Sequence, residues 1–248
     1  MNVAGKKFTI LLSAIVFLIL LIYFIKSENE QSVRYTGFGI SIPGGYAMHG
    51  IDVSKYQKTI QWDEVAGMED QGIKIAFAIT KATEGTDYTD PHFRRNWDDM
   101  KRHHIQRGAY MYFHPSLDAK RQAIHFIQTV KQLSKGDLLP VVDIEESQQC
   151  APLLVQKKLK ECLSVLEEFY HQKPIIYTNP VFFEEMLNDS FPEYPLWIAH
   201  YTNNSKPGIS TPWCIWQHHC TGHVNGIDAL VDFNVVRDAS SQLKITVP

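Results

Sequence analysis

Two carboxylic acids stand two residues apart at the end of an apolar run in the sequence. The run reads LLPVVDIEES over residues 138–147, and Ile144 separates Asp143 from Glu145. If the run is a strand, its side chains alternate between two faces and both acids point the same way. Like charges held together raise the pKa of at least one carboxyl, and a carboxyl protonated near neutral pH can act as a general acid. The pair therefore predicts acid–base chemistry, although capping of a following helix or pairing with surface lysines would use the same residues.

The elements that must position this pair follow from the hydrophobic pattern. Short runs rich in Ile, Val, Tyr and Phe predict strands at 50–53, 73–80, 108–113, 139–144, 174–177, 196–199, 214–217 and 230–233. Apolar stripes at helical spacing predict helices that begin at Asp90 and that cover 118–133, 153–171 and 181–187. Strands that alternate with helices indicate a mainly parallel sheet, here a closed or nearly closed β/α barrel. The last three strands have little helix between them, so we expect that side to be irregular or partly antiparallel.

Polar or aromatic residues follow nearly every predicted strand at the same end. They are Asp52, Lys81, Glu84, Tyr112, His114, Tyr177, Asn179, His200, Tyr201, Trp216, Gln217, Asp232 and Asn234. The C-terminal ends of the strands carry the active site in β/α barrels, and structural acids have no reason to collect there. Taken together, these residues predict a functional site at that end of the barrel. Tyr110 and Trp197 lie inside apolar runs, which favours core packing for these two.

The N-terminus predicts a separate segment. Residues 8–25 contain no charge and follow Lys6 and Lys7, and about 20 apolar residues suffice to span a bilayer. We expect a cytoplasmic N-terminus at 1–7, an uncleaved transmembrane signal anchor at 8–25, a tether at 26–46 and a catalytic domain at 47–240. The domain would then lie in the periplasm or outside the cell, held to the membrane by a single pass. A long signal peptide that is removed is the alternative.

Four cysteines are consistent with an exported chain. Sequence proximity suggests the disulfides Cys150–Cys162 and Cys214–Cys220 among three possible pairings, and buried thiols are an open alternative. A zinc site is the competing interpretation, because five candidate ligands crowd together: Cys214, His218, His219, Cys220 and His223. No C-x-x-C spacing occurs there, and adjacent histidines on a strand point to opposite faces, so we expect no metal.

The overall charge and composition limit the classes of binding partner that we expect. The formal net charge is −3 and no basic stripe occurs, so we expect no nucleic-acid partner. Aromatic residues make up 12% of the chain, and many stand beside polar residues, which suits a cleft that holds sugar rings or other flat faces. We expect a monomer.

Eight motifs occur in an order that resembles glycoside hydrolase family 25, the muramidases or lysozymes. They are HGIDVSKYQ, ITKATEG, GAYMYFHP, PVVDIE, IIYTN, LWIAHY, IWQ and VDFN, between about residues 47 and 237. The resemblance implies an irregular, flattened (β/α) barrel, a TIM-barrel-like glycosidase fold. It also implies hydrolysis of the β-1,4 bond from N-acetylmuramic acid to N-acetylglucosamine in peptidoglycan, without a metal or other cofactor.

Carried over residue by residue, the resemblance makes Glu145 the acid that protonates the departing glycosidic oxygen. Asp143 would orient the N-acetyl group or stabilise positive charge, and Asp52 and Asp232 match the other two acidic positions of the cleft. We lean to participation of the substrate's acetamido group, because no carboxylate nucleophile is obvious. The expected substrate-binding residues are Tyr112, His114, Tyr177, Tyr201, Trp216, Gln217, Lys81 and Glu84.

Three other functions use parts of the same pattern. A non-catalytic peptidoglycan-binding module would be expected to lose Glu145 or Asp143, and both are present. A chitinase-type hydrolase of acetamido sugars is compatible with the D-x-E pair alone, but not with the matched first and last motifs. A magnesium-dependent phosphodiesterase would need further histidine and glutamate ligands at the strand ends, which are not evident.

Overall fold

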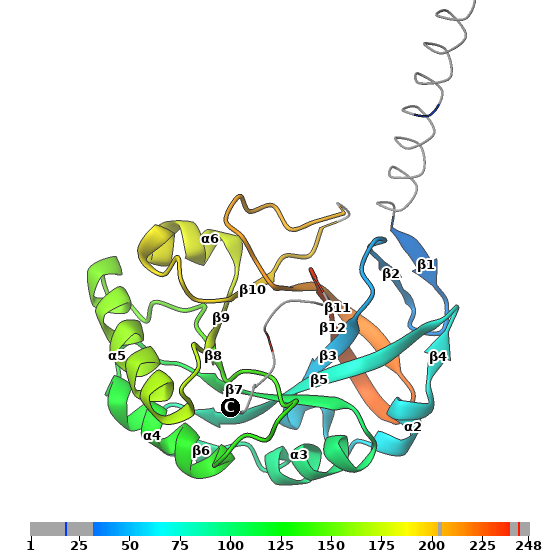
Figure 1. Ribbon diagram of the computed structural model, residues 1–248, viewed down its shortest axis with the longest axis horizontal. Helices are drawn as coiled ribbons and strands as arrows, with labels where there is room; N and C mark the ends of the chain where they lie inside the picture. The colour runs from blue at the N-terminus through cyan, green and yellow to red at the C-terminus, as the bar shows by residue number, and fades with distance from the viewer. Residues whose placement is uncertain (1–17, 19–31, 203–204, 239–242, 244–248) are drawn as a thin grey trace, which may run out of the picture.

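Eight strands close into a barrel in the computed structural model, which describes residues 18, 32–202, 205–238 and 243 (Figure 1). The barrel strands are β3 (His49–Val53), β5 (Ile73–Glu84), β7 (Gln106–Tyr112), β8 (Val141–Asp143), β9 (Ile175–Thr178), β10 (Leu196–Ala199), β11 (Ile215–Val224) and β12 (Ile227–Val236). Their order around the barrel is β3-β12-β11-β10-β9-β8-β7-β5, and β5 pairs back onto β3 to close the ring.

The barrel is mixed rather than parallel throughout. Each of the steps from β3 through β5, β7, β8, β9, β10 and β11 joins parallel neighbours, whereas β12 runs antiparallel to both β11 and β3. β11 and β12 form a hairpin that turns at Gly226, where φ is 84°. A Cβ at Gly226 would lie 2.4 Å from the backbone oxygen of Gln61, so only glycine fits this turn.

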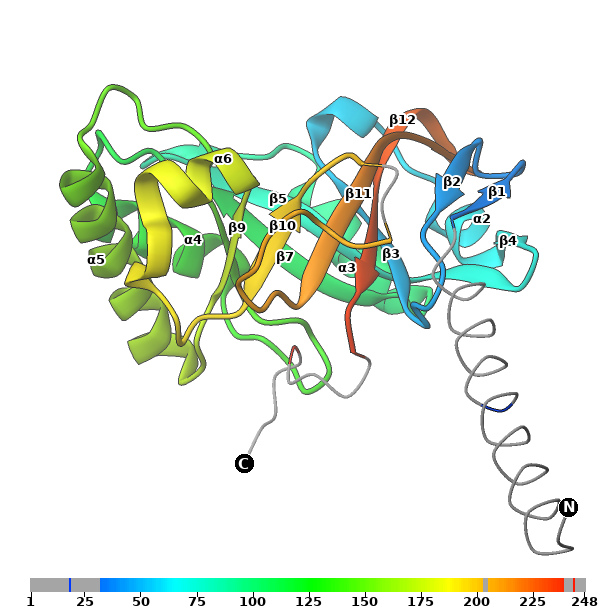
Figure 2. The same ribbon diagram turned by 90° about the horizontal axis from the view of Figure 1, so that it is seen from above.

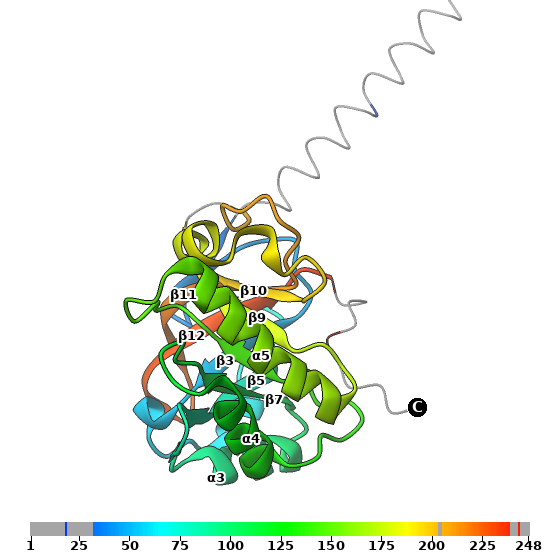
Figure 3. The same ribbon diagram turned by 90° about the vertical axis from the view of Figure 1, so that its left-hand side faces the viewer.

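Long helices cover one flank of the barrel, as Figures 1 and 3 show. α3 (Phe93–Arg102), α4 (Ala119–Val130) and α5 (Pro152–Tyr170) connect β5 to β7, β7 to β8 and β8 to β9 in turn. α4 begins at Asp118, whose carboxylate accepts a hydrogen bond from the Arg121 backbone, and α5 begins with a proline in its first turn. Their apolar stripes pack on the outer face of the strands, as the sequence pattern predicts.

The remaining elements are short. They are η1 (Lys55–Gln57), α2 (Trp62–Gly67), β4 (Glu69–Asp70), β6 (Tyr88–Thr89), α6 (Pro180–Phe182), the π-helical turn η2 (Phe183–Leu187) and η3 (Asn188–Ser190). η1 carries a capping box, in which Ser54 and Gln57 bond each other's backbone, directly after β3. This turn fixes the direction of the chain as it leaves the first barrel strand.

A hairpin covers the barrel on the flank opposite α4 and α5 (Figure 2). It consists of β1 (Val33–Tyr35) and β2 (Ile40–Ile42), and it buries Phe38, Ile40 and Ile42 completely or nearly so. The His223 backbone in β11 donates a 2.9 Å hydrogen bond to the Phe38 carbonyl. Residues 33–42 lie within the predicted tether at 26–46, and in the structure they form this hairpin and contribute Phe38, Ile40 and Ile42 to the main core.

The predicted TIM-barrel-like fold is therefore wrong. That fold requires eight parallel strands, each followed by a helix, whereas here β12 is antiparallel and, among the described residues, no long helix follows β3, β10 or β11. The physical reason lies in residues 200–214, whose Gly, Pro, Ser and Asn content offers no apolar stripe that could hold a helix against the sheet. The β1–β2 hairpin covers the apolar outer surface of this flank instead.

Strand alternation divides the apolar residues into two layers. One layer fills the barrel interior below the strand ends and includes Phe77, Ile79, Val141 and Ile175, while the other lies between the strands and their helices or hairpin. The interior is filled tightly: a Cβ at Gly50 in β3 would lie 2.5 Å from the Phe77 ring. The polar ends of the same inward-facing rows line the site.

The predicted transmembrane helix is not part of the described fold. Its segment, residues 8–25, lies outside the described residues apart from Leu18. Among the residues that the structure does describe, no helix is long and apolar enough to cross a bilayer.

Candidate active site

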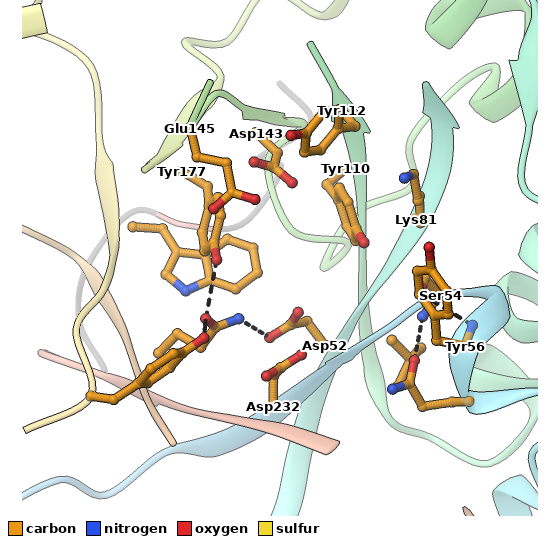
Figure 4. A pocket seen from close by; sticks show the side chains of 15 residues that line it. Asp52, Ser54, Tyr56, Lys81, Tyr110, Tyr112, Asp143, Glu145, Tyr177 and Asp232 are labelled. Atoms are coloured by element: carbon orange, nitrogen blue, oxygen red, sulfur yellow. Dashed lines mark hydrogen bonds between the residues drawn. The ribbon is translucent and has the colours of Figure 1, made fainter. Parts of the chain in front are cut away.

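A pocket of about 320 Å³ opens at the C-terminal ends of the barrel strands (Figure 4). It contains all four acids that the sequence singled out, and they come from three different strands or strand ends. Its lining is Asp52, Val53, Ser54, Tyr56, Gln57, Lys81, Tyr110, Tyr112, Asp143, Glu145, Tyr177, Trp197, Tyr201, Gln217 and Asp232. Residues far apart in the sequence thus form one concave, acid-rich surface.

The first wall carries Asp143 and Glu145, at the end of β8. Ile144 between them is fully buried in the layer outside the barrel, and its backbone N–H donates to the Tyr177 carbonyl at 2.9 Å. This bond extends the strand geometry past its last regular residue, so the two acids point to the same side. The predicted alternation of Asp143, Ile144 and Glu145 is confirmed.

The two acids of this wall differ in their surroundings. Asp143 is 7% exposed, and its Oδ1 atom is buried without any hydrogen-bond partner. Burial, followed by the negative charge of Glu145, raises the pKa of Asp143 well above its ordinary value, while Lys81 opposes this shift. Glu145 is partly exposed, and burial and the neighbouring Glu146 raise its pKa. Both carboxyls therefore hold a proton to higher pH than free carboxylic acids do.

The facing wall carries Asp52 and Asp232, which are cross-strand partners on β3 and β12. Asp52 Oδ2 accepts hydrogen bonds from Gln217 Nε2 at 2.8 Å and from Asn234 Nδ2 at 2.7 Å. Burial raises the pKa of Asp52, and these two hydrogen bonds act against the shift. Burial and then the charges of Asp52 and Glu145 raise the pKa of Asp232. Because like charges this close repel, the pair favours a state with at least one proton.

A chain of hydrogen bonds holds Asp52 from both sides. Trp197 Nε1 donates to Asn234 Oδ1 at 2.8 Å, which orients the Asn234 amide so that its nitrogen faces Asp52. On the other side, Gln217 Oε1 accepts hydrogen bonds from the hydroxyls of Tyr177 at 3.1 Å and Tyr201 at 2.7 Å. These contacts fix which end of each amide points to the carboxylate, so Asp52 is held by donors alone.

Lys81, Glu84 and His114 form a second chain at the edge of the pocket. Lys81 Nζ lies 2.6 Å from Glu84 Oε2, and His114 Nε2 lies 3.3 Å from Glu84 Oε1. Within the described part of the chain, Lys81 is the only cationic residue of the pocket lining. Glu84 and His114, predicted to bind substrate, lie behind Lys81 and do not line the pocket.

One prediction about the aromatic residues, that Trp216 binds substrate, is wrong. Trp216 is fully buried, its indole N–H donates to the His200 carbonyl at 2.8 Å, and its ring packs against Tyr46 and Trp213 outside the barrel. It therefore cannot serve as a sugar platform. Trp197 is buried in the barrel core, as its apolar run predicts, and both it and Tyr110 also face inward and line the pocket. The side of the strand that faces inward depends on the register of the closed barrel, which the sequence pattern did not show.

Sequence reasoning missed the residues that follow β3. Ser54, Tyr56 and Gln57 line the pocket, and the Tyr56 side chain is 71% exposed at its mouth. The capping box of η1 holds this turn, and the Gln57 amide also donates to the Leu230 carbonyl at 2.9 Å. The signal was present in the motif HGIDVSKYQ, where an aromatic residue follows a strand end by three positions.

The four cysteines are free thiols, so both predicted disulfides are wrong. Cys162 lies ten residues into α5 from Pro152, a distance of about 15 Å along a helix, while Cys150 precedes that helix. Cys214 and Cys220 are separated by six residues of extended chain, about 20 Å, and a disulfide needs Cα atoms within about 7 Å. Closeness in sequence does not bring residues together within one regular element.

The proposed zinc ligands also fail to converge. Cys214 precedes β11, while Cys220 is exposed and His218 is buried further along the same strand. Among the described residues, no group of three or more His, Cys, Asp or Glu side chains could hold a metal ion.

Several known proteins are similar to this chain in sequence and fold. The sequence model of the family described as glycosyl hydrolases family 25 matches residues 51–227. The chain is 39% identical to the protein YegX of Escherichia coli O6:H1, over 96% of this chain and 93% of that protein. It is 30% identical to Lysozyme M1 of Streptomyces globisporus, over 79% of this chain and 70% of that protein. Among solved structures, the bacterial lysozyme from Streptomyces coelicolor matches with a TM-score of 0.72 at 28% identity, covering 79% of this chain and 95% of that one.

Proposed function

We propose that this chain, which belongs to glycosyl hydrolase family 25 and is a glycoside hydrolase, cleaves the β-1,4 bond between N-acetylmuramic acid and N-acetylglucosamine in peptidoglycan. The observation that carries the proposal is the pocket of Figure 4, in which Asp143 Oδ1 is buried without a partner beside Glu145. A buried polar atom that is left unpaired costs about 1–3 kcal/mol, so its retention needs a reason. A substrate group that pairs with it supplies that reason.

Glu145 is the proposed general acid. It is partly exposed in the pocket, so a glycosidic oxygen can reach it, and burial and then the charge of Glu146 raise its pKa, so it keeps its proton to higher pH than a free glutamic acid does. Donation of that proton to the departing oxygen makes the sugar a better leaving group, and the resulting carboxylate can then activate water. A positioned general acid of this kind contributes about 10²–10⁴-fold to rate.

Asp143 is the proposed partner of the substrate's acetamido group. Its free Oδ1 can accept the acetamido N–H, which turns the acetamido oxygen toward the anomeric carbon. Attack by that oxygen forms a bond to the anomeric carbon as the glycosidic bond breaks, so no carboxylate nucleophile is needed. An unchanged rate on a substrate that carries hydroxyl in place of the acetamido group would defeat this part of the proposal.

Asp52 and Asp232 are proposed to tune the site and position water or sugar. The two amides hold Asp52 in place, and the pair adds negative charge opposite the first wall, which favours a positively charged transition state. The sugar-facing surface is proposed to be aromatic, with Tyr56, Tyr112 and Tyr201 at the mouth. Their rings offer flat apolar faces to pyranose rings.

The folded unit that carries this activity extends further than the predicted domain. We infer that the catalytic domain predicted at 47–240 includes the β1–β2 hairpin in its fold, because the hairpin supplies part of the main core. Peptidoglycan lies outside the cytoplasm, so the proposed activity requires the domain to reach that side of the membrane.

Digestion of purified peptidoglycan by the full chain tests the function. Reduction of the products with borohydride followed by hydrolysis identifies the sugar at each new reducing end. New reducing ends of muramic acid are expected. Reducing-end glucosamine would indicate a different bond, and an absence of new ends would reject the activity.

A further inference from the structure

The cation of the pocket is paired with a carboxylate outside the pocket lining. Lys81 has a side chain that is only 10% exposed, and its ammonium lies 2.6 Å from Glu84 Oε2. The same ammonium lies 5.0 Å from the centre of the Tyr112 ring. In a pocket with four acids, the lysine is thus bonded to a fifth.

Glu84 is itself anchored from behind. Its second oxygen, Oε1, lies 3.3 Å from His114 Nε2. The His114 backbone is clamped by Gln122 of α4, which accepts from the His114 N–H and donates to the His114 carbonyl, both at 2.9 Å. Gln122 is fully buried, so this anchor is part of the barrel's outer layer. Glu84, whose side chain is 36% exposed, thus contacts Lys81 through one oxygen and the anchored His114 through the other.

The alternative partner for Lys81 is Asp143. Lys81 pairs in register with Tyr110, which pairs with Val141, so Asp143 lies two strands away and one inward-facing position further along. Two strand spacings are about 10 Å, and lysine carries its charge on a flexible four-carbon stem. Asp143 Oδ1 is buried and unpaired, which makes it an attractive acceptor for an ammonium.

The charged and titratable groups that face Asp143 divide by sign. The acids Glu145, Asp52 and Glu84 favour its protonated form, and Lys81 is the one cation acting on it among these groups. The hydroxyls of Tyr110, Tyr112 and Tyr177 lie around it and are neutral at physiological pH. The position of the Lys81 ammonium is therefore the variable that decides how much positive charge Asp143 experiences.

We propose that Glu84 is a positioning residue that captures the Lys81 ammonium and thereby keeps Asp143 Oδ1 free for the substrate. Without Glu84, Lys81 turns to Asp143 and forms an ion pair there. An Asp143 carboxylate bonded to lysine has lost the oxygen that the acetamido group needs. This inference rests on the proposed hydrolase function for its consequence in catalysis, but the capture itself can be measured without activity.

Titration of Asp143 by NMR in the full chain, labelled with ¹³C at the aspartate carboxyl carbons, measures the capture directly. The Asp143 signal is assigned by its loss in Asp143→Asn. Glu84→Gln is expected to lower the Asp143 pKa by about 1–3 units, the effect of an opposite charge that comes within about 4–6 Å. In the Lys81→Met background, Glu84→Gln removes only its own charge, and a much smaller shift is expected.

The comparison of the two shifts decides the proposal. Equal shifts with and without Lys81, or no shift in either, overturn it, because Glu84 then acts by its own charge or not at all. Unfolding curves for each variant check that the fold is intact. If Glu84→Gln does not fold, His114→Phe removes the anchor of Glu84 and is expected to lower the Asp143 pKa in the same Lys81-dependent way; a Lys81-independent result overturns the proposal.

Turnover of peptidoglycan adds the catalytic consequence. Glu84→Gln is expected to lower kcat about tenfold, corresponding to a change of about 1.4 kcal/mol in the barrier. Its alkaline pH profile should regain the parent shape when Lys81→Met is added. A Glu84 with a merely structural or sugar-binding role would show no such rescue. If the parent protein cleaves no peptidoglycan, the proposed function fails, while the NMR titration still tests the capture.

Discussion

Asp52 and Asp143 both lie at the ends of barrel strands and face each other across one pocket, but they differ in the hydrogen bonds that their oxygens accept. Asp52 Oδ2 accepts two amide hydrogen bonds, and those amides are oriented by further bonds from Trp197, Tyr177 and Tyr201. Asp143 Oδ1 has no hydrogen-bond partner among the residues that the structure describes. Protein donors therefore hold Asp52 Oδ2 in place, whereas Asp143 Oδ1 is available to a donor from a ligand.

The donors around each carboxyl separate supporting acids from acting ones. A carboxylate oxygen that two donors hold, such as Asp52 Oδ2, is stabilised as it stands, so its position is the contribution it makes. A buried carboxyl oxygen without a donor, such as Asp143 Oδ1, destabilises the free protein, and under the proposed function the substrate supplies the missing donor. The proposed function accordingly assigns the wall of Asp143 and Glu145 to chemistry and the wall of Asp52 and Asp232 to support.

The largest expected loss of activity comes from replacing Glu145, and it tests whether the general acid belongs to the wall of Asp143 and Glu145. Glu145→Gln keeps the size of the side chain but removes the proton that it donates, so kcat should fall by about 10²–10⁴. The measurement is release of reducing ends from purified peptidoglycan, and KM should change little. Glu146→Gln is the matched control, because Glu146 is the next residue, is exposed and does not line the pocket. Equal losses in the two variants would contradict the assignment.

A somewhat smaller loss is expected from the unpaired acid. Asp143→Asn keeps one acceptor oxygen but loses the carboxylate that steers the acetamido group, and removal of one such preorganised group costs about 10²–10³ in kcat. Initial rates on peptidoglycan over a range of concentrations separate kcat from KM. A variant with raised KM and unchanged kcat would mean that Asp143 only binds the sugar.

The supporting wall should be less sensitive. Asp52→Asn keeps the shape but turns an acceptor into a donor that faces one of the two amides, which removes a hydrogen bond worth about 1.5–3 kcal/mol. If only part of this lost energy raises the free energy of the transition state, kcat falls roughly tenfold. The same assay measures it. A loss as large as that of Asp143→Asn would contradict the supporting role, since both walls would then act in the chemistry.

The smallest effect is on stability and depends on pH. Burial and the nearby acids raise the pKa of Asp232, so folding favours its protonated form. The stabilising contribution is complete below the unfolded pKa of about 4 and is lost as pH rises through the higher folded pKa. Asp232→Asn removes this penalty and should raise Tm at about pH 8 more than at about pH 4.5, by about 2–4 °C for each kcal/mol recovered.

Asp228→Asn is the control for that measurement. Asp228 lies on the same strand but is exposed, so its replacement should leave the difference in Tm between the two pH values unchanged. A decrease in Tm for Asp232→Asn at the higher pH would show that ionised Asp232 stabilises the fold and would remove the argument from burial.

Much of the site could be predicted from local pattern. Alternation along a strand is a property of the backbone, so the common face of Asp143 and Glu145 followed from their spacing alone. The clustering of polar residues after apolar runs identified nine of the pocket residues before any contact was known: Asp52, Lys81, Tyr112, Asp143, Glu145, Tyr177, Tyr201, Gln217 and Asp232. The apolar stripes of α3, α4 and α5 could be predicted in the same way, because they depend only on the spacing of residues within each helix.

The tertiary structure decided what depends on pairing between distant strands. The antiparallel insertion of β12 between β11 and β3 makes Asp232 the cross-strand partner of Asp52, and no local pattern specifies that register. The same register turns Trp197 into the pocket and Trp216 away from it, although both stand in apolar runs. Local sequence determines which side chains share a face, because backbone geometry sets that spacing. Closure of the barrel determines which face is inside, because it depends on long-range hydrogen bonds and on burial of the whole core.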